Sequence, residues 1–148
     1  KDPKAIQSKA DALIENHADT PFATVAYFKK AQAYVVDKAY NKAEVMLKQV
    51  INDTDNEAFR AIAKLRLARI KLAIKQPDKA IAIVSGEWTS YFGWSDWVLG
   101  DCYREKGDEQ KAVFHYKKAL KALADNQIAN ILISQQLMAL PGDTYQGE

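Results

Sequence analysis

Cysteine and histidine, which together can perform nucleophilic catalysis, are scarce in this 148-residue chain, and its carboxylates are plentiful but scattered over the expected helix surfaces. A thiol and an imidazole can form a nucleophile pair, and the chain has one cysteine, Cys102, and two histidines, His17 and His115. Cys102 and His115 fall on neighbouring helical stretches, so such a pair is conceivable, but no third group is evident to orient the histidine. Two histidines and one cysteine without close spacing do not make a zinc site, and no glycine-rich phosphate loop is present. The residue types therefore predict a protein that is not an enzyme and that has no metal and no cofactor.

The composition is that of an ordinary soluble globular domain. Hydrophobic residues make up 48% of the chain and charged residues 27%. The net charge of +2 is too small to indicate nucleic-acid binding, and no nucleic-acid-binding motif is present. With a single cysteine no disulfide can form within the chain, so cysteine usage leaves the cellular compartment open. No apolar run approaches the roughly 20 residues of a membrane span.

Apolar residues recur at helical spacing along almost the whole chain, and glycine and proline are sparse. A first helix is expected to start at Asp2-Pro3 and to end before a break at Asn16–Pro21. Further helices are expected at about 22–36, 40–51, 57–75, 77–84, 94–106, 108–124 and 127–140. We expect one domain over residues 1–148, with repeats at 17–124, a capping helix at 125–140 and a polar tail at 141–148.

The stretch from Trp97 to Ala119 has the spacing of a tetratricopeptide repeat, a helix-turn-helix unit in which small residues let two antiparallel helices touch. The spacing is carried by Leu99, Gly100, Tyr103, Gly107, Ala112, Tyr116 and Ala119. Such repeats bind other proteins and rarely catalyse reactions. The question is therefore which partner this chain binds.

Two weaker copies precede this unit. Gly100 stands twelve residues before Ala112, and the same interval separates Ala31 from Ala43 and Ala68 from Ala80. A larger residue follows four positions later, and a further residue three positions after that: Leu47 and Val50, Val84 and Glu87, Tyr116 and Ala119. The middle unit departs from the pattern at Glu87. We therefore predict an all-α fold of three tetratricopeptide-like helical pairs, with the N-terminal and C-terminal helices as caps.

In stacked helix pairs the first helices line a concave surface, where a peptide or helix can bind. Aligning the three units places four residues of each first helix on one face, at the spacing i, i+3, i+7, i+10. These candidate groove residues are Val25, Phe28, Gln32 and Val35; Ile62, Leu65, Arg69 and Leu72; and Trp94, Trp97, Asp101 and Arg104. An alternative is that Phe28, Leu65 and Trp97 are core residues covered by the C-terminal helix, whose Ile128, Ile131, Leu132 and Leu137 need something to bury against.

Two other patterns also allow two explanations. Trp88, Tyr91, Phe92, Trp94 and Trp97 form an aromatic cluster that could be an exposed contact loop, but we expect most of them to plug an irregular connection, with one or two exposed.

The expected helix at 57–75 is basic. Its cations suit an acidic partner or anionic lipid, but a solvated helix surface is the explanation that we favour for them: Arg60, Lys64, Arg66, Arg69, Lys71 and Lys75.

The central repeat also resembles a known family. The block LRLAR at Leu65–Arg69, followed by KQPDKA at Lys75–Ala80, is similar to the tetratricopeptide-like domain of the ancillary SecYEG translocon subunit (YfgM-type) family of bacteria. Ala33–Lys38, Gly107-Asp108 and Lys111-Ala112 add to the likeness, which covers about Ala23 to Ala139.

The resemblance implies a single-span protein of the inner membrane, with this domain in the periplasm beside the SecYEG translocon and an anchor outside this chain. It also implies a link to periplasmic chaperones such as the foldase PpiD. We therefore expect a non-enzymatic scaffold for protein partners. The alternative is a free or lipid-anchored adaptor in envelope assembly or cell division, which a lipobox cysteine upstream would favour. A third possibility, a small hydrolase that uses Cys102, predicts loss of activity in Cys102→Ala.

Overall fold

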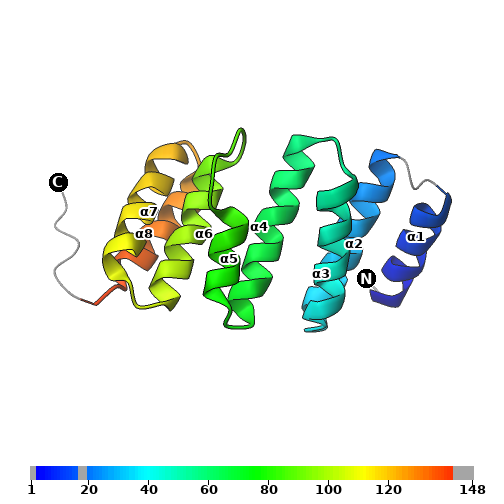
Figure 1. Cartoon of the computed structure of the whole chain (residues 1–148), viewed down its shortest axis with the longest axis horizontal. Helices are drawn as coiled ribbons and strands as arrows, with labels where there is room; N and C mark the ends of the chain where they lie inside the picture. The colour runs from blue at the N-terminus through cyan, green and yellow to red at the C-terminus, as the bar shows by residue number, and fades with distance from the viewer. Residues whose placement is uncertain (1–2, 17–19, 142–148) are drawn as a thin grey trace. The chain divides into compact units, whose positions relative to one another are not determined.

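The computed structural model describes residues 3–16 and 20–141, and these residues form eight helices and no strand. Figure 1 shows them in chain order. Their bounds are α1 (Pro3–Asn16), α2 (Pro21–Val36), α3 (Tyr40–Asp53), α4 (Glu57–Ala73), α5 (Pro77–Val84), α6 (Phe92–Glu105), α7 (Glu109–Ala122) and α8 (Gln127–Met138). The all-α prediction is confirmed. His17 and residues 142–148 of the expected tail lie outside the described residues.

The first helix of each pair ends in the same way, which supports the three-repeat alignment. The residue two positions after each end adopts a positive φ: Lys38 (56°), Lys75 (59°) and Gly107 (75°). The next amide donates back into the helix, from Ala39 to Tyr34, from Gln76 to Lys71 and from Asp108 to Tyr103, at 2.8–2.9 Å. This bond satisfies a carbonyl that the helix end would leave unpaired. Only the third repeat has the glycine that this backbone conformation favours.

Local sequence signals set where several helices begin. Pro21 and Pro77 occupy the first turns of α2 and α5, where a missing N–H costs nothing. The side chains of Asp108 and Asn126 accept hydrogen bonds from the amides of Lys111 and Ala129 and so cap α7 and α8. The amide of Lys111 also holds the pKa of Asp108 below its ordinary value.

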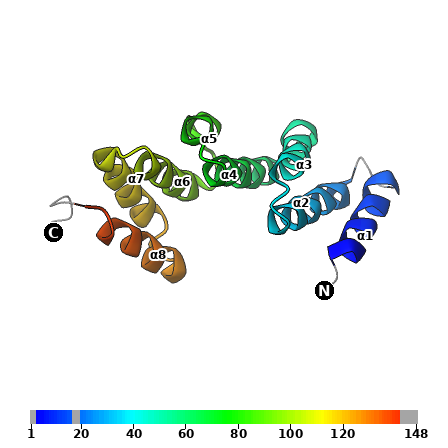
Figure 2. The ribbon, with the colours of Figure 1, turned by 90° about the horizontal axis from the view of Figure 1, so that it is seen from below.

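The chain divides into two compact units, Lys1–Ile70 and Lys71–Glu148, which we call the N-terminal and C-terminal units. In the N-terminal unit α2 packs against both α1 and α3. In the C-terminal unit α6 packs against α5 and α7, and α7 also packs against α8, as Figure 2 shows from below. The expectation of a single domain over residues 1–148 stays a prediction.

The small residues predicted to bring the paired helices together are all buried. Ala31 and Ala43 are at most 2% exposed, and so are Ala68, Ala80 and Ala112. At Gly100 an added Cβ would lie 2.5 Å from two ring carbons of Tyr116 on α7, so only glycine permits this approach of α6 and α7. Glu87, the predicted departure, lies three residues beyond the end of α5 and is exposed.

Candidate partner-binding faces

The twelve candidate groove residues differ widely in exposure. Five are exposed: Val25, Gln32, Val35, Arg69 and Arg104. Five are half-buried: Phe28, Ile62, Leu65, Leu72 and Trp94. Trp97 and Asp101 are buried and offer a partner almost no surface.

In the N-terminal unit, the outward surface of α2 is largely apolar. Phe22, Val25, Lys29, Gln32 and Val36 recur at helical spacing and are all exposed. Three of these five side chains are large and apolar, and none of the five is acidic. An exposed stripe of this kind is typical of an interaction site.

Phe28 connects this stripe to α4. Its ring packs edge-on against Phe59, with centroids 6.1 Å apart, and the guanidinium of Arg66 lies 4.7 Å from the Phe28 centroid. Partial burial of Arg66 without a compensating carboxylate lowers its pKa from the ordinary value. Arg66 therefore lies over an aromatic ring with its charge uncompensated.

In the C-terminal unit, Trp97 belongs to the core under α8. It is 7% exposed and shares a cluster with Ala129, Ile133 and Leu137 of α8. Its Nε1 donates a hydrogen bond to Oε1 of Gln136 at 2.6 Å, and Trp94 stacks on it with centroids 5.6 Å apart. Trp97 therefore holds α8 in place, which leaves Trp94 as the more accessible of the two rings.

Asp101 has an internal role as well. It accepts a hydrogen bond from the hydroxyl of Tyr116 at 2.8 Å, and the guanidinium of Arg104 lies 3.6 Å from the same oxygen. Burial, with the neighbouring negative charge of Asp101, raises the pKa of Tyr116 well above its usual range. The pair therefore joins α6 to α7 with the tyrosine protonated.

The outward surface of α8 is an apolar face that sequence reasoning missed. Ile128, Ile131, Leu132 and Met138 are between 44% and 73% exposed, and α8 contains no charged residue. A signal for it was available: a step of 34 residues, the usual length of this repeat, leads from Trp94, Trp97, Asp101 and Arg104 to Ile128, Ile131, Gln135 and Met138. Of the four apolar residues of this helix that the sequence alternative buried, Leu137 is buried, whereas Ile128, Ile131 and Leu132 stay exposed because α8 turns Ala129, Ile133 and Leu137 inward.

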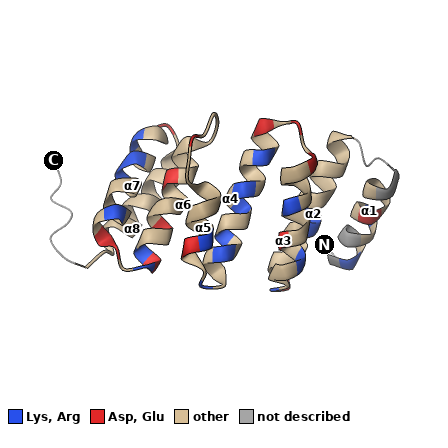
Figure 3. Ribbon diagram, viewed as in Figure 1, with Lys and Arg blue, Asp and Glu red and all other residues tan. Residues whose placement is uncertain are grey.

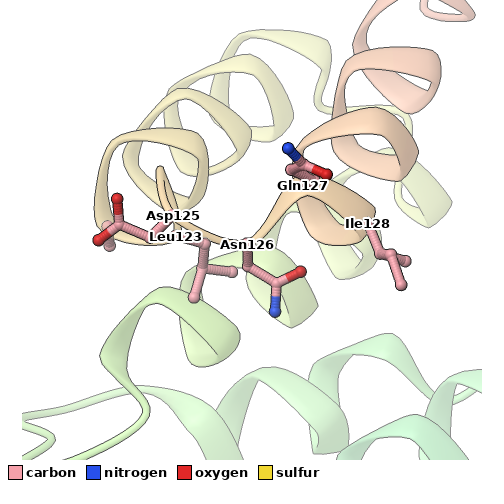
Figure 4. A pocket seen from close by; sticks show the side chains of 6 residues that line it. Leu123, Asp125, Asn126, Gln127 and Ile128 are labelled. Atoms are coloured by element: carbon pink, nitrogen blue, oxygen red, sulfur yellow. The ribbon is translucent and has the colours of Figure 1, made fainter.

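An open surface hollow of about 530 Å³ lies at the connection between α7 and α8. Figure 4 shows its lining side chains Leu123, Asp125, Asn126, Gln127 and Ile128. Nearby, Asn130 donates through Nδ2 to the carbonyls of Leu123, Ala124 and Asn126 at 2.7–3.1 Å. These bonds fix the turn, so the side chains of the hollow are positioned by the connection between the helices.

A polar cluster lies on another side of α6. The carboxylate of Asp96 is within 2.8 Å of Nδ1 of His115 and 3.1 Å of Nζ of Lys118, and the Tyr103 ring stacks on His115. These groups, with Trp88 and Phe92, line a cavity of about 300 Å³. Two aromatic side chains of the predicted cluster, Tyr91 and Phe92, are exposed, and Trp88, Trp94 and Trp97 are not, as expected.

The nucleophile chemistry considered for Cys102 finds little support. Cys102 is fully buried, so its thiol is closed to substrates, and the Nδ1 atom of His115 is engaged with Asp96. In residues 3–16 and 20–141 no group of three or more histidine, cysteine or acidic side chains is arranged to hold a metal ion. Over the same residues, none of the helices has both the length and the apolar character needed to cross a membrane.

Comparison with known proteins gives consistent results. A family model described as a tetratricopeptide repeat-like domain matches residues 1–142. Proteins named ancillary SecYEG translocon subunit are similar to the chain: the one from Aggregatibacter actinomycetemcomitans is 29% identical over 120 residues, and the one from Escherichia coli is 31% identical over 126.

These matches cover 80% and 81% of this chain but only 59% and 58% of the two relatives, so the chain spans less than two thirds of their length. A third relative of that name, from Buchnera aphidicola, is 26% identical over 141 residues, which are 91% of this chain and 71% of the relative. No solved structure matches the chain.

Proposed function

The chain belongs to the tetratricopeptide repeat-like domain family, and on this premise we propose that it is a non-enzymatic scaffold that binds partner proteins on the outward faces of its first helices and of α8. The observation that carries the proposal is the exposed apolar surface of α2 and α8. Large apolar side chains in a row at helical spacing are costly to leave in water, and they suit the apolar side of a partner helix. The half-buried Trp94 is an aromatic anchor of the kind that interfaces favour.

The partners we propose are the SecYEG translocon and a periplasmic chaperone or foldase such as PpiD. The translocon is supported by the names of the relatives, and the chaperone by the family resemblance of the central repeat. We further propose that the domain faces the periplasm and is tethered to the inner membrane by a single span outside this chain. A binding role without catalysis agrees with the burial of Cys102.

Crosslinking in intact cells followed by purification from membranes tests this function. The full-length protein carries an affinity tag, and partners are identified by mass spectrometry. Recovery of translocon subunits and a periplasmic foldase is the expected result, and recovery of cytosolic partners alone would contradict the proposal. A gene that encodes a lipobox cysteine upstream, in place of an apolar span, would favour the lipid-anchored adaptor.

A further inference from the structure

The charges of the N-terminal unit are distributed unevenly around its exposed apolar stripe. Helix α2 has two lysines and no acidic residue, and α4 has five basic residues and one acid, Glu57. The whole chain has a net charge of only +2, so these two helices are far more basic than the rest. Figure 3 shows the basic residues of α4 along the length of the helix.

Part of this charge is neutralised within the unit. Lys30 pairs with Asp11 of α1, and Arg60 pairs with Glu57 in the first turn of α4. Lys29, Lys64 and Arg66 form no ion pair within residues 3–16 and 20–141. Of these three cations, Lys29 lies on the α2 stripe itself and Arg66 lies over the Phe28 ring of the same helix.

Arg66 is the most constrained of these cations. Its guanidinium lies over the Phe28 ring, which in turn packs on Phe59, so aromatic contacts set the position of the guanidinium. A guanidinium held in this way can donate two parallel hydrogen bonds to a carboxylate, and less of its side-chain entropy is lost on binding. The site combines a positioned anion-binding group with apolar side chains at helical spacing on α2.

We propose that the face formed by α2 and α4 binds an acidic, amphipathic helical segment of a partner protein, with a partner carboxylate on Arg66 and partner apolar side chains on Phe22, Val25 and Val36. The inference rests on the proposed scaffold function and specifies its partner. A helix of a partner protein can contact both the cation on α4 and the apolar side chains of α2. Its own carboxylates and apolar side chains recur at the same helical spacing as the exposed side chains of α2. An anionic membrane is the competing occupant, which the test includes.

Peptide binding to the complete 148-residue chain tests the proposal. Two fluorescent helical peptides have the same leucine and phenylalanine side chains along one face of the helix. The opposite face carries aspartate and glutamate in the acidic peptide and lysine in the basic peptide. Fluorescence anisotropy should detect binding of the acidic peptide, and its affinity should fall about tenfold or more as salt rises from about 50 mM to about 500 mM. Equal affinity for both peptides, or no binding of the acidic one, would overturn the proposal.

Variants assign the binding to Arg66. Arg66→Glu should weaken the acidic peptide about tenfold or more, while the matched change Lys117→Glu on the exposed surface of α7 should leave affinity unchanged. Arg66→Lys keeps the charge but loses the planar fork and should give an intermediate loss. Circular dichroism establishes that each variant is folded.

The remaining outcomes separate this inference from the function on which it depends. If Val25→Asp abolishes peptide binding and Arg66→Glu does not change it, the proposed scaffold function is retained and the acidic partner is rejected. Binding of phosphatidylglycerol vesicles that requires Arg66, without binding of the acidic peptide, would assign the face to a membrane and overturn the inference.

Discussion

At the scale of single residues, several residues have a backbone conformation or a buried polar group that costs free energy, and the rest of the fold must offset this cost. Lys38 and Lys75 adopt left-handed backbone conformations, where a side chain is strained and glycine is not. The hydroxyl of Tyr116 lies in the core and donates a hydrogen bond to Asp101, which is also buried. Both features follow from the turn and the helix pairing, and both lead to measurable predictions.

The replacement Lys38→Gly should stabilise the chain by up to about 1 kcal/mol, because glycine removes the strain at a positive φ. The same substitution within a helix, Lys48→Gly on α3, is the matched control and should cost about 1 kcal/mol. Urea denaturation of the two variants gives both values. A destabilised Lys38→Gly would show that the left-handed turn is wrong.

Tyr116→Phe should destabilise the chain by about 1–3 kcal/mol at neutral pH, because it removes a buried hydrogen bond to the carboxylate of Asp101. The variant should also respond less to alkali. Because folding raises the pKa of Tyr116, its stabilising effect is complete below about pH 10, the unfolded value, and is lost as the pH rises further. Denaturation between about pH 9 and about pH 11, one unit either side of that value, should show a shallower loss for Tyr116→Phe than for the parent chain, and equal slopes would contradict the burial of the hydroxyl.

At the scale of elements, the repeat pattern predicted the helices well because it depends on local spacing and on small residues that must touch. The predicted helix at 77–84 has the same bounds as α5, and most other ends differ by one or two residues. Side-chain exposure was harder to predict. The face shared by Trp97 and Trp94 is partly covered because Gln136 of α8, 39 residues further along the chain, bonds to Trp97. Spacing within one helix carries no information about that contact.

The pairing of α6 with α7 depends on the absence of a side chain at Gly100. In an open helix, replacing glycine with alanine stabilises by about 1 kcal/mol. Here the added Cβ would meet the buried Tyr116 ring, so Gly100→Ala should instead cost about 1–3 kcal/mol. The melting temperature of Gly100→Ala should therefore fall below that of the parent chain. A rise would show that α6 and α7 are not in close contact at this position.

Docking of α8 depends on Asn130, which bonds to three carbonyls around the turn after α7. Asn130→Ala should remove these bonds, cost about 1–3 kcal/mol and raise hydrogen exchange across Gln127–Met138. Gln135→Ala, an exposed change on the same helix, serves as the control and should leave exchange near the parent rate. Similar exchange in the two variants would reject this role for Asn130.

At the scale of the whole molecule, the two units offer partners different chemistry. The N-terminal unit joins exposed apolar side chains on α2 to basic side chains on α4, and the C-terminal unit presents an uncharged apolar face on α8. The sequence identified the residue types on α2 and α4 through their periodicity. Burial of Trp97 under the C-terminal helix was one of two alternatives that the sequence left open, and the structure decides for it. The sequence did not indicate that Asp101 turns inward, since that depends on its contact with Tyr116 of α7.

The central claim is that outward faces of the first helices and of α8 bind partner proteins. The most direct measurement places a photo-crosslinking amino acid at Val25 or Ile131 in the full-length protein, and at the similarly exposed Val45 of α3 or Phe114 of α7 for comparison. Crosslinks to a protein partner from Val25 and Ile131, with few or none from Val45 and Phe114, are the predicted result. Crosslinks mainly from Val45 and Phe114 would contradict the account.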